Sequence, residues 1–98
     1  MPARAEVRIY VTSWCPYCIA AKRLLRQKDV AFTEVDVDGR EDLRSWLVSA
    51  SGQRTVPQVF VNGQPLGGFS DVEDLDQEGK LDKLLAEAPI AGLPALPG

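Results

Sequence analysis

The order of hydrophobic patterns along the chain is the feature that most restricts its fold. Residues 6–11 and 31–37 alternate polar and apolar side chains, as strands with one buried face do. Apolar residues recur at helical spacing over 16–28, and again from Leu43 at positions i+3, i+4 and i+7 within 41–51. Two strands joined by a helix are usually parallel, with a right-handed crossover. The first half of the chain therefore predicts a β-α-β unit followed by a second helix.

The second half of the chain predicts a hairpin and two further helices. Residues 56–61 form the expected third strand, and Asn62-Gly63 behind it is a strong signal for a tight turn into a returning strand. We expect the next helix to be capped at Ser70 and a short last helix to lie around 81–85. The order β-α-β-α-β-β-α predicts an α/β fold, a four-stranded mixed sheet with helices on both faces.

The length and composition are those of one small domain. The chain has 98 residues, and 45% of them are hydrophobic, which is enough for a single core. We assign residues 1–88 to this domain. Residues 89–98 contain three prolines and two glycines, and we expect them to form a flexible tail.

Charge and hydropathy restrict the partners and the location. The net charge is −3, with basic residues interspersed among acidic ones, which argues against nucleic acid or an anionic membrane as the main partner. No segment resembles a signal peptide, and no apolar run approaches the roughly 20 residues that span a bilayer. We therefore expect a cytoplasmic protein, acting as a monomer, in a compartment that keeps thiols reduced.

The two cysteines, Cys15 and Cys18, are the only ones in the chain, and three roles are open to them. A structural zinc site takes four ligands, usually Cys and His, and without any histidine this chain would need a second chain to complete it. A disulfide that closes so short a loop would stabilise the fold little, and a reducing compartment disfavours it. The pattern favours a redox pair, because Cys-x-x-Cys stands where a strand of the β-α-β unit passes into its helix.

The position of the pair at a helix start predicts different roles for Cys15 and Cys18. Unpaired backbone N–H groups and the positive end of the helix dipole favour the thiolate of a cysteine at a helix start. We therefore expect Cys15 to be the nucleophile. Cys18 lies one turn inside the helix, close enough to attack a mixed disulfide on Cys15, and we expect it to be the resolving thiol.

Three motifs in this order resemble those of a known family. They are Cys-Pro-Tyr-Cys at 15–18, Thr-Val-Pro-Gln-Val-Phe-Val-Asn-Gly at 55–63, and Gly-Gly-Phe-Ser-Asp at 67–71. Together they resemble the motifs of the glutaredoxins, and the resemblance covers roughly residues 7–85. It implies a thioredoxin-like fold and a glutathione-dependent thiol–disulfide oxidoreductase that reduces glutathionylated and disulfide-containing proteins. Glutathione would be the co-substrate, and no metal is expected.

The resemblance also implies where glutathione would bind. Pro57 would be a cis-proline that faces the cysteines, and the backbone of Val56 would pair with the cysteinyl part of glutathione. The γ-glutamyl end would lie at the start of the third helix. The residues implied to bind glutathione are Thr12, Tyr17, Gln53, Thr55, Val56, Pro57, Gly68, Phe69, Ser70 and Asp71.

One position departs from the family pattern. Many glutaredoxins carry a lysine three residues before the first cysteine, where it assists the thiolate and the glycyl carboxylate of glutathione. Here that position is Thr12. Gln53, or Arg54 beside it, could receive the carboxylate instead. Stabilisation of the thiolate would then depend more heavily on the helix start.

Two other functions remain open at this point. The protein could be an electron carrier that a flavoprotein reductase of the thioredoxin type supplies, in place of glutathione. It could also hold an iron–sulfur cluster between two protomers, each giving Cys15, with glutathione supplying the other thiolates. In the family that second role goes mostly with other residues after the first cysteine, and Pro16 argues against it.

Overall fold

The computed structural model describes residues 5–89, 92 and 95–98. The elements, in chain order, are β1 (Val7–Val11), α1 (Pro16–Gln27), β2 (Thr33–Asp36), α2 (Glu41–Ser51), β3 (Gln58–Val61), β4 (Gln64–Gly67), α3 (Phe69–Gln77) and α4 (Lys80–Ala86). Every expected strand and helix is present, in the expected order. Within these described residues, none of the helices has the length and apolar character needed to cross a membrane.

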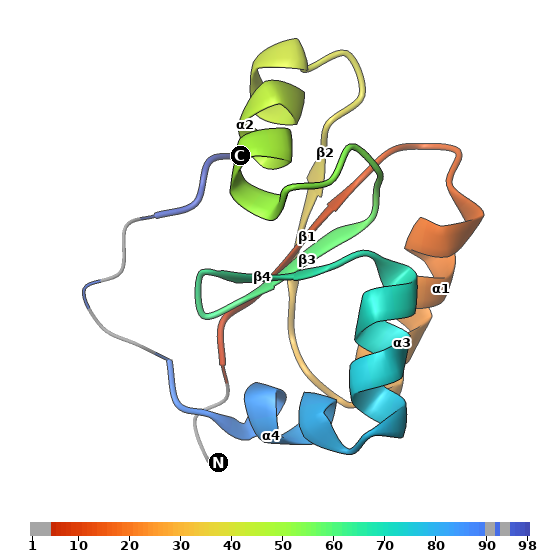
Figure 1. The fold of residues 1–98 in the computed structure, drawn as a ribbon, viewed down its shortest axis with the longest axis vertical. Helices are drawn as coiled ribbons and strands as arrows, with labels where there is room; N and C mark the ends of the chain where they lie inside the picture. The colour runs from red at the N-terminus through yellow and green to blue at the C-terminus, as the bar shows by residue number, and fades with distance from the viewer. Residues whose placement is uncertain (1–4, 90–91, 93–94) are drawn as a thin grey trace.

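The four strands form one mixed sheet in the order β2-β1-β3-β4 (Figure 1). β1 pairs with β2 in parallel, and β3 pairs antiparallel with both β1 and β4. In this arrangement the last residues of β1, the first residues of β3 and the last residues of β4 all lie at the same end of the sheet, viewed along its strands. The predicted α/β fold, with a parallel unit and an antiparallel hairpin, is confirmed.

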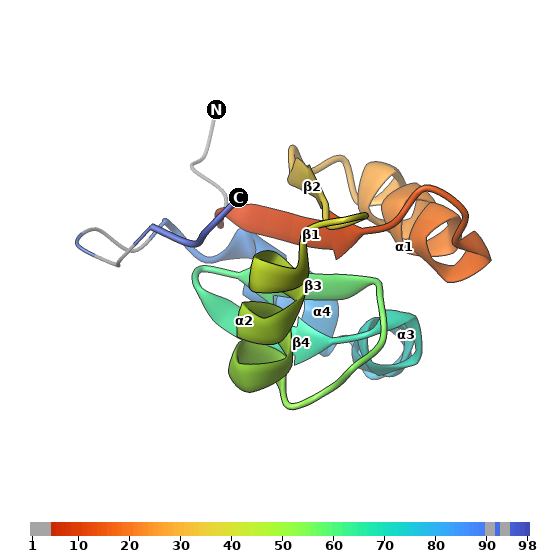
Figure 2. The same cartoon turned by 90° about the horizontal axis from the view of Figure 1, so that it is seen from above.

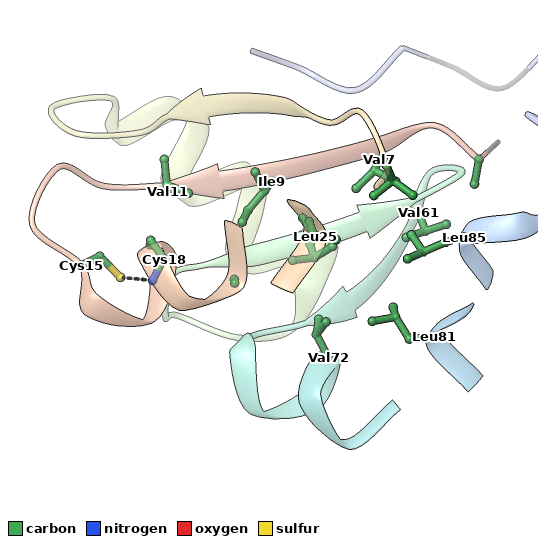
Figure 3. Close-up of a cluster of buried hydrophobic side chains, with 14 residues drawn as sticks. Val7, Ile9, Val11, Cys15, Cys18, Leu25, Val61, Val72, Leu81 and Leu85 are labelled. Carbon is green, nitrogen blue, oxygen red and sulfur yellow. Dashed lines mark hydrogen bonds between the residues drawn. The ribbon is translucent and has the colours of Figure 1, made fainter. Parts of the chain in front are cut away.

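The sheet is covered on both faces, with α1, α3 and α4 on one side and α2 on the other (Figure 2). The alternation of β1 explains why both faces are apolar. Val7, Ile9 and Val11 point into a core with α1, α3 and α4 (Figure 3). Tyr10 points to the opposite face, where it packs in a second core with Phe60 of β3 and with residues of α2.

The start of α3 differs from the expectation. Ser70 was expected as the N-cap, but the helix begins at Phe69 and Gly68 is the N-cap. The carboxylate of Asp71 turns back and accepts a hydrogen bond from the Gly68 N–H at 3.0 Å. Gly67, with φ of +111°, lies so close to this carboxylate that a side chain there would collide with it. The two glycines therefore leave room for the Asp71 carboxylate to bond the N-cap N–H. The prediction that Ser70 caps the helix is wrong.

Two strands are shorter than their hydrophobic patterns. β2 covers Thr33–Asp36 of the expected 31–37. β3 begins only at Gln58 and not at Val56. Pro57 has no N–H to donate to a neighbouring strand, so the regular pairing starts after it.

The described end of the C-terminal segment lies against the sheet. The Tyr10 hydroxyl donates to the Pro97 carbonyl at 2.6 Å, and Arg8 Nη1 donates to the Leu96 carbonyl at 3.2 Å. The Leu96 side chain packs on the core beneath α2. A buried tyrosine hydroxyl needs an acceptor, and the Pro97 carbonyl supplies it. The flexibility expected of residues 89–98 stays a prediction. Residues 90, 91, 93 and 94 of the expected tail lie outside the described residues.

Deleting residues 95–98 should lower the melting temperature. The deletion removes two hydrogen bonds to the sheet and exposes part of the core beneath α2. A net loss of about 1–2 kcal/mol corresponds to roughly 4–16 °C in a domain of this size. Circular dichroism melts of the two proteins measure this shift.

A Tyr10→Phe variant provides the matched control, because it removes one of the two hydrogen bonds without shortening the chain. The deletion should cost less in the Tyr10→Phe background than in the native background, since the two changes share an interaction. Identical melting temperatures with and without residues 95–98 would show that the contact contributes nothing.

Candidate active site

Cys15 forms the N-terminal cap of α1. It lies four residues beyond the end of β1, has an extended backbone, and is followed by Pro16 in the first turn of the helix. Its sulfur accepts a hydrogen bond from the backbone N–H of Cys18 at 3.1 Å (Figure 3). An N–H donor and the positive end of the helix dipole both favour a negative charge on this sulfur. This is the position at which the sequence predicts the nucleophile.

The Cys15 sulfur also faces the peptide unit that precedes β3. Its thiol donates to the Val56 carbonyl at 3.7 Å, and the bond between Val56 and Pro57 is cis, as the resemblance implied. Cys15 and Val56 meet because the end of β1 and the start of β3 lie side by side, with Tyr10 opposite Gln58 in the sheet. A substrate sulfur bonded to Cys15 would therefore lie beside the backbone of Val56.

Cys18 is the more deeply buried of the two thiols, with 2% of its surface exposed against 9% for Cys15. Both are free cysteines in this structure. Burial raises the pKa of the Cys18 thiol, and hydrogen bonding to Cys15 raises this pKa further. Cys18 is therefore a neutral thiol near pH 7, one turn behind the Cys15 sulfur.

An open groove of about 480 Å³ is lined in part by Val56, whose carbonyl accepts from the Cys15 thiol. Its lining residues are Tyr17, Gln53, Thr55, Val56, Pro57, Gly68, Phe69, Ser70 and Asp71. All of them are among the residues implied to bind glutathione, and the structure brings them together from α1, the α2–β3 loop and the start of α3.

The start of α3 gives its end of the groove both aromatic and polar groups. The rings of Tyr17 and Phe69 lie 6.2 Å apart between their centroids and form an aromatic wall. The first N–H groups of α3 have no carbonyl partner within the helix, so this end suits an anion. Asp71, beside them, supplies a carboxylate that suits a cation. A ligand with a carboxylate and an ammonium on one carbon matches this end of the groove.

Thr12 is not part of the groove lining. A smaller cavity of about 250 Å³ continues from Gln53 and Val56 toward α2, where Arg44 and Arg54 line it. Arg44 and Arg54 therefore bring positive charge to a cavity that Thr12 does not line. Gln53 lines both cavities.

Two residues of the site were not found from the sequence. Gln58 is fully buried, and its side-chain Nε2 donates to Gln53 Oε1 at 2.8 Å and to the Thr55 carbonyl at 2.9 Å. The signal for it was a polar residue at the start of an otherwise apolar strand. Asp38 accepts a hydrogen bond from the Ser13 N–H at 2.8 Å and so holds the turn before Cys15.

The contact with Asp38 is electrostatic as well as geometric. Hydrogen bonding from Ser13 lowers the pKa of the Asp38 carboxyl, with a smaller contribution from the charge of Arg44. The sequence indicated only a turn at Asp38-Gly39, because nothing local shows that this carboxylate reaches back to Ser13.

Metal ligands are sparse in the described part of the chain, where no group of three or more His, Cys, Asp or Glu side chains could hold an ion. The described residues themselves offer two free thiols, one of which contacts a residue of the groove lining.

The stability of the reduced protein should fall as the pH rises above about 8.5. The folded-state pKa of Cys18 is raised by burial, so the stability linked to it is present below the ordinary pKa of a thiol and is lost as the pH approaches the folded value. Urea unfolding at pH 7.5 and 9.5, under reducing conditions, measures the difference.

A Cys18→Ser variant should show a smaller loss over the same interval, because serine does not titrate there. Tyr10, whose pKa burial also raises, contributes only near pH 10 and above. Equal losses in the native protein and in Cys18→Ser would rule out Cys18 as the source.

The sequence of the chain matches a known family over most of its domain. The sequence profile described as Glutaredoxin matches residues 7–66. A glutaredoxin of Pseudomonas aeruginosa is 48% identical over 80 residues, which cover 82% of this chain and 95% of the relative. Glutaredoxin 3 of Escherichia coli is 46% identical over 81 residues, which cover 83% of this chain and 98% of the relative.

Solved structures agree with this assignment. The crystal structure of a buckwheat glutaredoxin–glutathione complex has a TM-score of 0.77 at 30% identity, covering 83% of this chain and 76% of that one. The solution structure of a glutaredoxin from Brucella melitensis has a TM-score of 0.77 at 40% identity, covering 86% and 91%. With the paired thiols and the groove in place, the chain belongs to the glutaredoxin family of thiol–disulfide oxidoreductases, within the thioredoxin-like superfamily.

Proposed function

We propose that the protein is a glutathione-dependent thiol–disulfide oxidoreductase that reduces glutathionylated proteins and protein disulfides, as a monomer in the cytoplasm. The observation that carries this proposal is the position of the Cys15 sulfur, 3.7 Å from the Val56 carbonyl at the edge of a groove of about 480 Å³. A groove of this size accommodates a small peptide. The buckwheat glutaredoxin with the same fold was crystallised with glutathione.

The groove fits glutathione in one direction. Its cysteinyl residue pairs with the backbone of Val56, which brings its sulfur to Cys15. The γ-glutamyl end lies at the start of α3, where backbone N–H groups receive the carboxylate and Asp71 receives the ammonium. The glycyl carboxylate lies toward Gln53 and Arg54, which compensates for the missing lysine at Thr12.

The reaction with a glutathionylated protein needs only Cys15. Its thiolate attacks the glutathione sulfur of the mixed disulfide, a new bond joins Cys15 to glutathione, and the protein thiolate leaves and takes up a proton. The thiolate of a second glutathione then attacks the glutathione sulfur on Cys15. Oxidised glutathione is released and the Cys15 thiolate is restored.

A protein disulfide requires Cys18 as well. Cys15 attacks one substrate sulfur and releases the other as a thiolate, leaving a mixed disulfide between Cys15 and the substrate. Cys18 gives up its proton as it attacks the Cys15 sulfur, which releases the reduced substrate and forms the Cys15–Cys18 disulfide. Two molecules of glutathione then reduce this disulfide and become oxidised glutathione.

A coupled assay tests the proposed electron source. NADPH consumption should follow substrate reduction with glutathione and glutathione reductase, and not with a thioredoxin-type flavoprotein reductase. The visible spectrum of anaerobically purified protein should lack the absorption of an iron–sulfur cluster. Turnover with the flavoprotein reductase alone would overturn the proposal.

Replacement of each cysteine by serine should separate the two reactions. Cys15→Ser should reduce all activity to background, because of the two cysteine sulfurs it is that of Cys15 that contacts Val56, a lining residue of the groove. Cys18→Ser should retain removal of glutathione from mixed disulfides, while reduction of intramolecular protein disulfides falls by at least tenfold. Assays with a glutathionylated protein and with a disulfide protein measure both. Activity in Cys15→Ser would contradict the mechanism.

Asp71→Asn should raise the KM for glutathione mixed disulfides by about tenfold and leave kcat nearly unchanged. The asparagine oxygen still accepts the Gly68 N–H, but the charge that pairs with the substrate ammonium is lost. Glu73→Gln, on the same helix but outside the groove lining, is the matched control and should keep the native KM. An equal KM for both variants and the native protein would remove Asp71 from the binding site.

A further inference from the structure

Gln58 is a buried polar side chain whose place in the fold is not explained by packing. It is the first residue of β3, and the rest of that strand is Val59, Phe60 and Val61, all buried. No part of Gln58 is exposed, and its Oε1 has no hydrogen-bond partner among the described residues. An apolar side chain of similar size would avoid an unpaired buried acceptor, so stability alone does not account for a glutamine here.

The two N–H groups of Gln58 are both used, and both are directed at the loop that forms the groove. One donates to the side-chain oxygen of Gln53 at 2.8 Å, and the other donates to the backbone carbonyl of Thr55 at 2.9 Å. Gln58 therefore ties the loop on either side of Arg54 to the sheet, immediately before the peptide unit that faces Cys15.

The contact with Gln53 selects one orientation of the Gln53 amide. With its oxygen accepting from Gln58, Gln53 presents its Nε2 to the groove, where it donates to Asp71 Oδ2 at 3.2 Å. In the flipped orientation, two NH₂ groups would face each other at Gln58 and two oxygens would face each other at Asp71. Only the observed orientation satisfies both neighbours.

This series of hydrogen bonds connects the α2–β3 loop to the start of α3, across the groove. It runs from Gln58 to Gln53, and from Gln53 to the Asp71 carboxylate that also accepts the Gly68 N–H at 3.0 Å. We propose that Gln58 is a positioning residue, which orients the Gln53 amide so that the N–H that Asp71 does not use faces the carboxylate-bearing co-substrate. This inference rests on the proposed function, because glutathione supplies the carboxylate.

The consequence should appear in substrate binding and not in the chemical step. Gln58→Met keeps the side-chain length and removes both donors, so the Gln53 amide loses its fixed orientation. We expect KM for a glutathione mixed disulfide to rise about three- to tenfold, the range for loss of one well-placed hydrogen bond, with kcat within about twofold of the native value.

A double-mutant cycle with Gln53→Ala distinguishes positioning from a merely structural role. If Gln58 acts through Gln53, then Gln58→Met should have little further effect on KM once Gln53 is alanine. A general loosening of β3 would instead raise KM by the same factor in both backgrounds, and that result would overturn the inference, as would an unchanged KM in Gln58→Met. Val61→Ala, a buried change in the same strand, is the control for lost stability and should keep the native KM.

If Gln58→Met does not fold, nuclear magnetic resonance on the native protein tests the coupling between Gln58 and Gln53. The side-chain NH₂ protons of Gln58 should exchange slowly with solvent, and unreactive S-methylglutathione should shift the side-chain amide signals of Gln53 and Gln58 together. A titration that shifts Gln53 and leaves Gln58 unchanged would refute the coupling. If the native protein neither binds S-methylglutathione nor turns over glutathione mixed disulfides, it is the proposed function that fails.

Discussion

The hydrogen bond from the Cys18 N–H to the Cys15 sulfur is the interaction on which the site depends. A helix start must satisfy its first N–H groups, and here the reacting sulfur does so itself. The capping hydrogen bond thus orients the Cys15 sulfur, and no other side chain is needed to cap the helix. Cys18 lies one turn behind Cys15, where burial raises the pKa of its thiol.

The sheet explains why distant segments meet at this sulfur. β1 ends where β3 begins, because the two strands are antiparallel with Tyr10 opposite Gln58. β4 runs back along β3 and ends at the same edge, which brings the start of α3 beside the α2–β3 loop. The strand order therefore brings Cys15, the Val56 backbone and the start of α3 together.

The sequence predicted the fold well because its signals are local. Hydrophobic periodicity located each element, Asn62-Gly63 located the hairpin, and Cys-x-x-Cys at a strand-to-helix junction indicated redox chemistry. The groove residues came from the resemblance to glutaredoxins. The features that could not be predicted depend on contacts between residues that the local sequence pattern does not connect. They are the hydrogen bonds between Asp38 and Ser13, between Tyr10 and Pro97, and between Gln58 and Gln53. The helix start at Gly68 was missed for another reason, since Asp71 competes with Ser70 as the capping side chain and wins through two adjacent glycines.

The cap on α1 has a thermodynamic consequence for the redox couple. A sulfur in a disulfide is a poorer hydrogen-bond acceptor than a thiolate, so oxidation of the ionised form of Cys15 weakens the bond from the Cys18 N–H and leaves the first turn of α1 less well satisfied. The helix start therefore binds the reduced form of the site more tightly than the oxidised form. By linkage, whatever stabilises the reduced form raises the reduction potential. The difference in the local stability of α1 between the reduced and the oxidised form is thus one part of the oxidising strength of the protein.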